Sequence, residues 1–271
     1  MRLALLLLAA LAGLKLLVWW LEPRMAFFPW RGVQETPASF GLAYTEHRVA
    51  TADGESLHAW WMEHPTPRAQ VVYWHGNGGN LSLWLDVVAD LRKRGFSVLA
   101  VDYRGYGAST GKPSERGVYR DGEAATSYFN ERLRQAGSPV IFWGRSLGCA
   151  VASYAASRSA PDAVLLESPF PDVGSLFARN PVMRLLSVFS SYTFATSQHL
   201  EKYSGPLLVI YGDADSIIPF RAGRRVYDRA ASPQKTFAVL EGADHNDVLT
   251  GHPAYWTAID RFISSLGHKK Q

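Results

Sequence analysis

The chain has 271 residues, of which 47% are hydrophobic and 19% charged, a composition that excludes a disordered or fibrous protein and fits one large or two small domains. Its 28 basic and 24 acidic side chains leave a formal charge of +4 without a basic run, so no nucleic-acid partner is expected. The single cysteine, Cys149, excludes an internal disulfide framework and a multi-cysteine zinc site.

The first predicted element is a leucine-rich stretch, Leu3–Leu21, in which Lys15 is the only charge. A helix of this length spans about 28 Å, close to the roughly 30 Å hydrocarbon core of a bilayer. The leucines outweigh the insertion cost of one lysine. We therefore expect an uncleaved signal-anchor and linker over residues 1–27, with a cleaved signal peptide and a soluble core helix as less favoured alternatives. Basic residues stand on both sides of the span, so its orientation is open.

From about Tyr44 the pattern is that of an α/β protein. Two short runs, His47–Thr51 and Ser56–Met62, flank an Asp-Gly turn and predict a hairpin. Buried parallel strands are predicted by the apolar runs Gln70–Trp74, Phe96–Val101, Pro139–Trp143, Ala163–Leu166, Pro206–Tyr211 and Lys235–Leu240. Helical patterns alternate with them at Leu83–Arg94, Val118–Arg134, Leu147–Arg158, Arg221–Ala231 and Pro253–Leu266. A mostly parallel central sheet flanked by helices is therefore expected in one catalytic domain, residues 28–271, with a small cap at about 171–203.

The strongest chemical motif is Gly144-Arg145-Ser146-Leu147-Gly148. It follows a predicted strand and opens a predicted helix, the context that a G-x-S-x-G nucleophile elbow requires. The flanking glycines permit a tight turn that exposes the serine hydroxyl above the sheet. We interpret Ser146 as a nucleophile; the alternative is an ordinary turn serine.

A serine nucleophile needs a base, and the base needs an orienting carboxylate. Asp215 follows the strand that ends near Tyr211 and is the favoured acid, with Asp213 as the rival that more naturally tightens the turn. His245 lies in the loop after the next strand and is the favoured base, with His252 as the alternative. The predicted order Ser, Asp, His is the one found with this type of elbow.

An oxyanion hole needs two amide donors. The amide of Leu147, at the start of the helix, is one candidate. The loop from His75 to Asn80 is rich in glycine and follows an early strand, so the amide of Asn77 is the second. His75 itself is expected to tie this loop down, with a role as a base as the alternative.

These motifs together resemble the α/β-hydrolase superfamily. More narrowly, the chain resembles its membrane-anchored α/β-hydrolase-domain branch, which includes serine aminopeptidase-like and depalmitoylase-like proteins. The shared motifs are a His-Gly-Asn loop, an Asp-Tyr-Arg-Gly-Tyr-Gly turn and a Gly-Arg-Ser-Leu-Gly elbow, here His75–Asn80, Asp102–Gly107 and Gly144–Gly148. The resemblance covers roughly residues 28–267 and implies the α/β-hydrolase fold and a serine hydrolase of esters, thioesters or amides. Unlike the depalmitoylating relatives, this chain has no cysteine cluster near its amino terminus.

The combined hypothesis is a single-pass membrane serine hydrolase that cleaves carboxylic esters or thioesters through an acyl-enzyme, without a metal or organic cofactor. Work at a membrane surface makes lipid-like or acylated substrates the first to consider. A serine peptidase with the same triad is the enzymatic alternative, although the cap offers only two carboxylates, Asp172 and Glu201, to hold a substrate amine. A non-catalytic, membrane-tethered binding protein is the alternative outside enzymes.

Overall fold

The computed structural model describes the whole chain except residues 1, 177–180, 248 and 268–271, so four residues of the expected cap lie outside the described part. Its strands are β1 (Phe28–Pro29), β2 (Thr45–Ala50), β3 (Ser56–Met62), β4 (Ala69–Trp74), β5 (Gly78–Gly79), β6 (Phe96–Val101), β7 (Val140–Arg145), β8 (Ala163–Glu167), β9 (Leu207–Gly212) and β10 (Lys235–Leu240). Its α-helices are α1 (Arg2–Ala26), α2 (Leu85–Lys93), α3 (Glu115–Tyr128), α4 (Leu147–Ser159), α5 (Val173–Leu176), α6 (Pro181–Leu186), α7 (Thr196–Leu200), α8 (Phe220–Arg229) and α9 (Pro253–Gly267). Shorter helical turns are η1 (Pro37–Phe40), η2 (Phe129–Leu133), η3 (Ser187–Phe189) and η4 (Leu249–Gly251).

The central sheet has eight strands in the order β10-β9-β8-β7-β4-β6-β3-β2. Strands β4 and β6 to β10 run parallel, whereas β3 is antiparallel to both β6 and β2. The expected hairpin is thus β2–β3, and each predicted parallel strand is present. The prediction of a mostly parallel sheet flanked by helices is confirmed.

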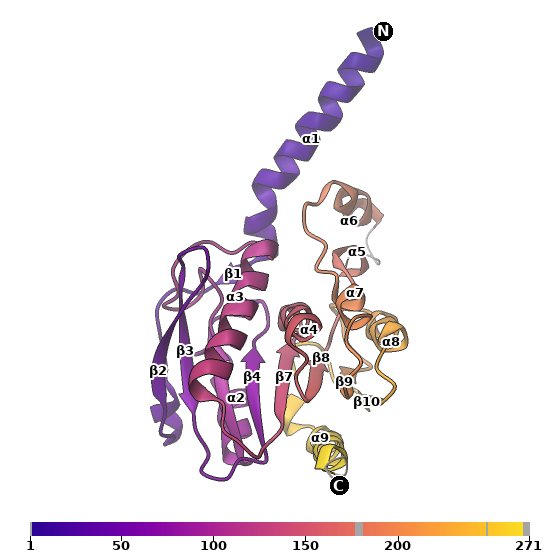
Figure 1. Ribbon diagram of the computed structural model, residues 1–271. Coiled ribbons are helices and arrows are strands. Elements are labelled where there is room, and N and C mark those ends of the chain that lie inside the picture. Colours follow the sequence, from indigo (N-terminus) through magenta and orange to yellow (C-terminus); the bar gives the residue numbers. More distant parts are fainter. Residues whose placement is uncertain (1, 177–180, 248, 268–271) are drawn as a thin grey trace.

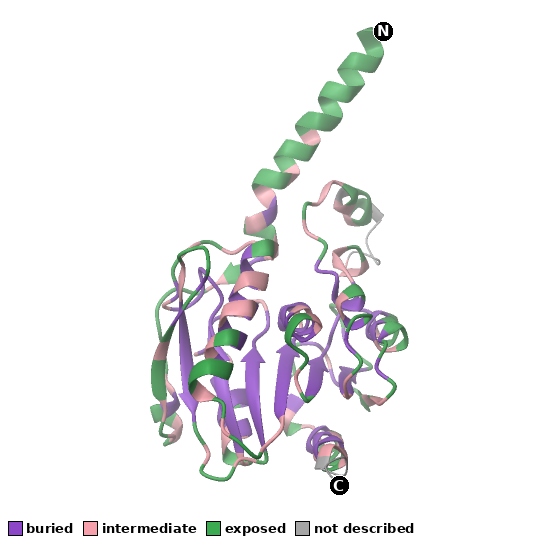
Figure 2. Ribbon diagram, in the orientation of Figure 1, coloured by how far each residue is buried: buried purple, intermediate pink, exposed green. Residues whose placement is uncertain are grey.

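Helices cover both faces of this sheet (Figure 1). Alternate side chains of β4 show why, since Val72 and Trp74 join the core beneath α3, α4 and α8, while Val71 and Tyr73 join the core beneath α2 and α9. In Figure 2 the central strands are buried along their length. A strand that is buried on both faces reads as a continuous apolar run, which is why the sequence pattern located these strands well.

The strand order reverses around β4. From β4 the chain passes to β6 on one side, and it then returns to place β7 on the other side. Ligands of open α/β sheets bind outside the carboxyl ends of the strands at such a switch point. The loop after β4 and the turn after β7 therefore meet at the sheet edge that faces α1 and the cap in Figure 1.

Helix α1 is longer than the predicted span, because it continues past Leu21 to Ala26 with Pro23 inside it. Contacts with the folded body support these added turns. The carboxylate of Glu22 is buried, and the amide group of Asn77 donates to the carbonyl oxygen of Ala26 at 2.7 Å. A helix end whose carbonyl has a partner is stabilised against fraying. Within the described residues, α1 is the one helix that is long and apolar enough to cross a membrane.

The chain after α1 pairs with the loop after β4, a contact that the sequence pattern did not predict. Strand β1 runs parallel to β5, with Phe28 opposite Gly78 and Pro29 opposite Gly79. The amide of Trp30 then donates to the carbonyl of Gly79 at 2.9 Å. Two-residue strands leave no periodic signal, so only the folded chain reveals that α1 is joined directly to this loop.

Candidate active site

Ser146 stands at the sharp turn between β7 and α4. Its backbone φ is 51° and its ψ is −112°, a conformation that L-residues rarely adopt. The glycines on either side make the turn possible. A Cβ atom on Gly144 would overlap the carbonyl of Gly148, and one on Gly148 would overlap the carbonyl of Trp74. The close approach of helix and strand raises the serine side chain above the sheet edge.

Three predicted site residues lie in one hydrogen-bonded chain. The Nε2 atom of His245 is 3.2 Å from the Ser146 hydroxyl, and its Nδ1 atom is 2.7 Å from Oδ2 of Asp215. The other carboxylate oxygen of Asp215 accepts the amides of Ile217 and Ile218 at 3.0 and 2.7 Å. Asp215 and His245 are buried, whereas Ser146 is partly accessible. This arrangement allows the imidazole to accept a proton from the serine while the carboxylate fixes its orientation.

The two rival residues lie elsewhere. Asp213 accepts a hydrogen bond from the amide of Gly242 at 2.7 Å. This bond joins the loop after β9 to the loop after β10. The ring of His252 lies 3.2 Å from the carbonyl of Glu241. The structure therefore brings together the favoured acid and base and leaves the alternatives in structural contacts.

The loop that carries Asn77 lies against the start of α4. Because Gly148 packs on the carbonyls of Trp74 and His75, the backbone after β4 runs beside Leu147. Asn77 is held firmly, since its side chain donates to Ala26 and accepts the Tyr106 hydroxyl at 2.8 Å. The position agrees with an oxyanion site, but the role of the two amides stays a prediction.

His75 does not reach the serine; it belongs to a buried cluster with Asp102 and His58. One carboxylate oxygen of Asp102 is 3.0 Å from Nδ1 of His58, and the other lies 3.4 Å from Nε2 of His75 and accepts the amide of Leu81 at 2.9 Å. Burial raises the pKa of Asp102, but the two histidines outweigh this effect, so the pKa lies below its ordinary value. An ionised Asp102 therefore holds the loop that carries Asn77 from beneath.

Arg145, the variable residue of the elbow, holds the loop that carries the base. Its guanidinium donates to the carbonyls of His245 and Asp247 at 3.1 and 2.9 Å. Its other terminal nitrogen lies 3.8 Å from the buried carboxyl group of Glu167, which accepts the hydroxyl of Tyr255 at 2.5 Å. Burial raises the pKa of Glu167. The sequence analysis missed this role, because a variable motif position carries no signal for a partner 100 residues away.

Replacing Arg145 by lysine is expected to lower kcat about tenfold or more. One guanidinium nitrogen binds both carbonyls while the other lies beside Glu167, and a single ammonium cannot occupy both places. The measurements are kcat and KM on a soluble ester. We expect kcat to fall while KM stays within about twofold, since a misplaced imidazole of His245 weakens proton transfer and not substrate binding. A variant with a lower melting temperature and an unchanged kcat would give Arg145 a purely structural role.

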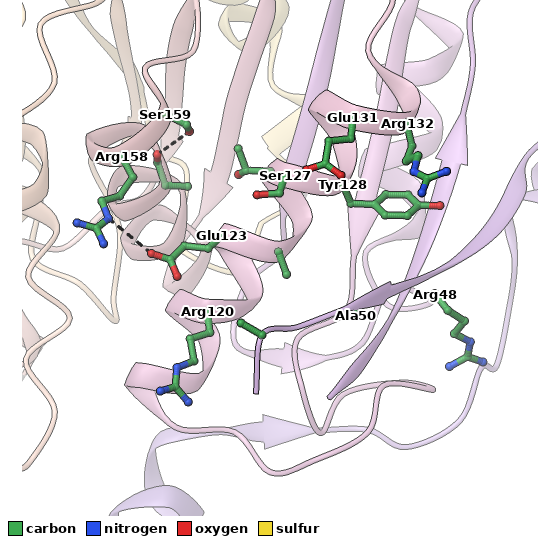
Figure 3. Close-up of a pocket in the computed structure, with 14 residues that line it drawn as sticks. Arg48, Ala50, Arg120, Glu123, Ser127, Tyr128, Glu131, Arg132, Arg158 and Ser159 are labelled. Atoms are coloured by element: carbon green, nitrogen blue, oxygen red, sulfur yellow. Dashed lines mark hydrogen bonds and ion pairs between the residues drawn. The ribbon is translucent and has the colours of Figure 1, made fainter. Parts of the chain in front are cut away.

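A groove of about 770 Å³ lies away from this site, between β2, α3 and α4 (Figure 3). Its lining includes arginines and glutamates, among them Arg120, Glu123 and Arg158, and none of the predicted site residues. It is therefore not part of the candidate active site. Over the described ranges, no group of three or more histidine, cysteine, aspartate or glutamate side chains could hold a metal ion.

The sequence is similar to that of known hydrolases and their relatives. The family model described as serine aminopeptidase S33 matches residues 65–198 and 175–249. An uncharacterized protein of Mycobacterium tuberculosis is 32% identical over 93% of this chain and 91% of its own length. The lysophosphatidylserine lipase ABHD12 of Mus musculus is 29% identical over 75% of this chain, which spans only 56% of that protein.

The fold also has close counterparts among solved structures. An esterase of Pyrococcus furiosus superposes with a TM-score of 0.72, at 22% identity, over 89% of this chain and 97% of its own. At this level of identity the likeness shows the fold alone. The matched family region contains the elbow, the loop after β4 and both loops that carry the acid and the base.

Proposed function

Because the chain belongs to the serine aminopeptidase S33 family of the α/β-hydrolase superfamily, we propose that this hydrolase is a membrane-anchored serine esterase or thioesterase. The observation that carries the proposal is the hydrogen-bonded chain from Ser146 through His245 to Asp215. Each member comes from a different loop at the carboxyl edge of the sheet. Such convergence of nucleophile, base and orienting acid is the arrangement that acyl transfer requires.

In the first step, the hydroxyl of Ser146 attacks the acyl carbonyl and gives its proton to Nε2 of His245. Asp215 accepts a hydrogen bond from the Nδ1–H group and, staying ionised, stabilises the imidazolium that forms. The amides of Leu147 and Asn77 donate hydrogen bonds to the oxyanion. In comparable sites each such donor lowers the activation free energy by about 3–4 kcal/mol. His245 then protonates the leaving alcohol or thiol, and the acyl group remains on Ser146.

In the second step, water hydrolyses the acyl-enzyme. His245 takes a proton from this water as its oxygen attacks the ester carbonyl, and then returns a proton to Ser146 as the acid leaves. No step requires a redox change or a cofactor. The alternative of a non-catalytic binding protein is disfavoured because the three groups are within reach of one another.

The two carboxylates of the cap already have partners, which favours an ester over a peptide substrate. An aminopeptidase needs a free carboxylate to bind the substrate amine. Asp172 accepts the amide and hydroxyl of Ser175 at 2.9 Å, and Glu201 binds Arg229 at 2.8 Å. Both cap carboxylates are therefore engaged. The name of the ABHD12 relatives, lysophosphatidylserine lipase, supports a lipid-like acyl ester as the substrate class.

We further propose the domain organisation. Residues 1–27 form the anchor and linker, residues 28–271 form the catalytic domain, and the cap occupies about 171–203. Support for the anchor comes from the length and composition of α1, whose side chains from Leu3 to Leu17 are mostly exposed to the surroundings (Figure 2). An exposed run of leucines is unfavourable in water and favourable in lipid.

This proposal predicts a preference for acyl esters over aminoacyl anilides. The purified full-length protein is expected to hydrolyse p-nitrophenyl esters at least about 100-fold faster, in kcat/KM, than the p-nitroanilides of free amino acids, because the cap offers no free carboxylate to bind an α-amine. An activity series across acyl lengths identifies the preferred chain. Faster cleavage of the anilides would favour the peptidase alternative.

A further inference from the structure

The helix that precedes the catalytic domain is bound along one of its sides. The exposed fraction falls at Leu14, Val18 and Leu21, and Glu22 is buried, whereas the positions between Leu14 and Leu21 are otherwise exposed. These positions recur at intervals of three and four residues and share one helical face. From Leu14 onward, α1 is thus packed against the protein.

The contact on this face is with the cap, and two charged side chains make it. The ammonium of Lys15 donates to the carbonyls of Phe189 and Ser190 at 2.7 and 3.2 Å. The carboxylate of Glu22 accepts the amides of Ser191 and Tyr192 at 2.9 and 3.2 Å, and the Ser190 hydroxyl also donates to it. Two charged side chains of the helix therefore satisfy the polar backbone of the cap segment at residues 189–192.

The position of Lys15 sets the depth of the cap. Residues 2–14 make up only about 20 Å of helix, which is about 10 Å less than a bilayer core. The remaining length is found between Lys15 and Leu21, another 9 Å or so of helix. A helix that crosses the hydrocarbon core with its whole apolar length therefore carries the cap segment at Phe189 and Ser190 below the surface of the leaflet.

The side chains and backbone of the cap suit that depth. Leu185 and Val188 are 67% and 75% exposed, and their spacing of three places them on one side of the α6–η3 segment. Single exposed apolar side chains are common on soluble proteins. Val188 belongs to the η3 turn, whose Phe189 carbonyl accepts from Lys15 of the apolar helix, and Leu185 lies in the helix just before that turn. Backbone in lipid must also have its polar groups satisfied, and Lys15 and Glu22 do this for the adjoining turn.

We propose that the α6–η3 segment of the cap is inserted into the leaflet that α1 crosses, so that the bilayer itself covers this apolar surface. The inference rests on the proposed membrane anchoring of α1. It goes beyond a tether, because α1 and the cap then hold the active-site edge of the sheet at a fixed depth. The alternative is a bilayer that thins around a short span while the cap stays in water.

An aromatic cluster links the base of α1 and the cap to the edge of the sheet. Phe27, at the base of α1, lies 5.7 Å from the ring of Tyr192 and 6.1 Å from that of Phe194. Phe194 is in turn 6.5 Å from Phe170, which follows β8 beside the elbow. An aromatic cluster thus continues from the leaflet side of the molecule to the edge of the sheet that carries Ser146.

The depth of the cap is testable with a fluorescent label on the full chain in phosphatidylcholine vesicles. The native Cys149 is fully buried, and burial raises the pKa of its thiol, so a bimane reagent labels an introduced cysteine. The variants are Val188→Cys in the cap, Leu8→Cys in α1 and Glu131→Cys in η2, the turn that follows α3. Quenching by lipids with a doxyl group near the headgroup end of the acyl chain reports contact with the leaflet.

We expect quenching of the labels at positions 188 and 8 and none at position 131. Quenching at position 8 alone would overturn cap insertion and leave the anchor intact. Absence of quenching at both positions 8 and 188 would overturn the anchor as well. Quenching at all three positions would indicate nonspecific association of the domain with lipid and would likewise overturn the inference.

Activity provides a second readout. The double variant Leu185→Asp, Val188→Asp is expected to hydrolyse a long-chain p-nitrophenyl ester in vesicles about tenfold or more slowly, since a charge resists insertion. Its hydrolysis of soluble p-nitrophenyl acetate should stay unchanged. Val239→Asp, at an exposed valine of the edge strand β10, is the matched control and should affect neither. Equal losses on both substrates would overturn the inference.

Discussion

Replacing Ser146 by alanine is expected to abolish covalent labelling by a fluorophosphonate and to lower kcat on esters by on the order of 10⁶-fold. The reason is that the proposed attack has no second nucleophile in position. The Ser146 hydroxyl is the group that lies 3.2 Å from the base, and Cys149 is fully buried with the pKa of its thiol raised by burial. The residual activity should come from the oxyanion site and substrate binding.

Measurements of labelling, ester turnover and melting temperature on one preparation separate chemistry from folding. Ser127, an exposed serine of α3 away from the site, supplies the control, and Ser127→Ala should label and turn over as the wild type does. The melting temperature of Ser146→Ala should be unchanged, because its hydroxyl contacts only the base in the described contacts. Turnover that survives in Ser146→Ala would sink the proposed mechanism, and a wild-type protein that resists labelling would favour the binding-protein alternative.

Asp215→Asn is expected to lower kcat by on the order of 10⁴-fold while the loop stays folded. In the wild type, one carboxylate oxygen of Asp215 accepts hydrogen bonds from the amides of Ile217 and Ile218. The asparagine oxygen of the variant can still accept both. The other oxygen becomes an amide NH₂ group that faces Nδ1 of His245. That NH₂ group cannot accept a hydrogen bond from Nδ1–H and instead donates to a bare Nδ1. The imidazole of His245 then carries its proton on Nε2, and in this tautomer it cannot act as a base toward the serine.

The same substitution two residues earlier is the matched control. Asp213→Asn keeps an acceptor for the amide of Gly242 and lies outside the chain of three groups, so kcat should change less than about threefold. Steady-state kinetics of both variants on one soluble ester decides between them. If Asp213→Asn proves the more damaging of the two, the orienting acid has been assigned to the wrong residue.

The sequence predicted the fold well because of the central strands. Runs such as Phe96–Val101 are apolar apart from one serine, since both of their faces are covered by helices. Their alternation with helices implied a parallel sheet, and the position of the elbow between a strand and a helix implied that Ser146 stands at its edge. The expected chain order of serine, acid and base selected Ser146, Asp215 and His245, and the folded chain places these three residues in hydrogen-bonding contact.

Tertiary structure alone decided the contacts between segments far apart in the chain. The donation from Arg145 to the loop of His245 joins residues whose separation no periodic pattern records. Likewise, the sequence alone presented Lys15 as a single charge that an apolar helix can tolerate. In the folded chain, its ammonium donates to the carbonyls of Phe189 and Ser190. Hydrophobic pattern and motif spacing are local properties of a sequence, and they were enough to predict the sheet and to place Ser146 at its edge. The partner of a charged side chain is fixed only when folding brings distant segments together, and only the tertiary structure joins α1, the cap segment at Phe189 and the loop of His245.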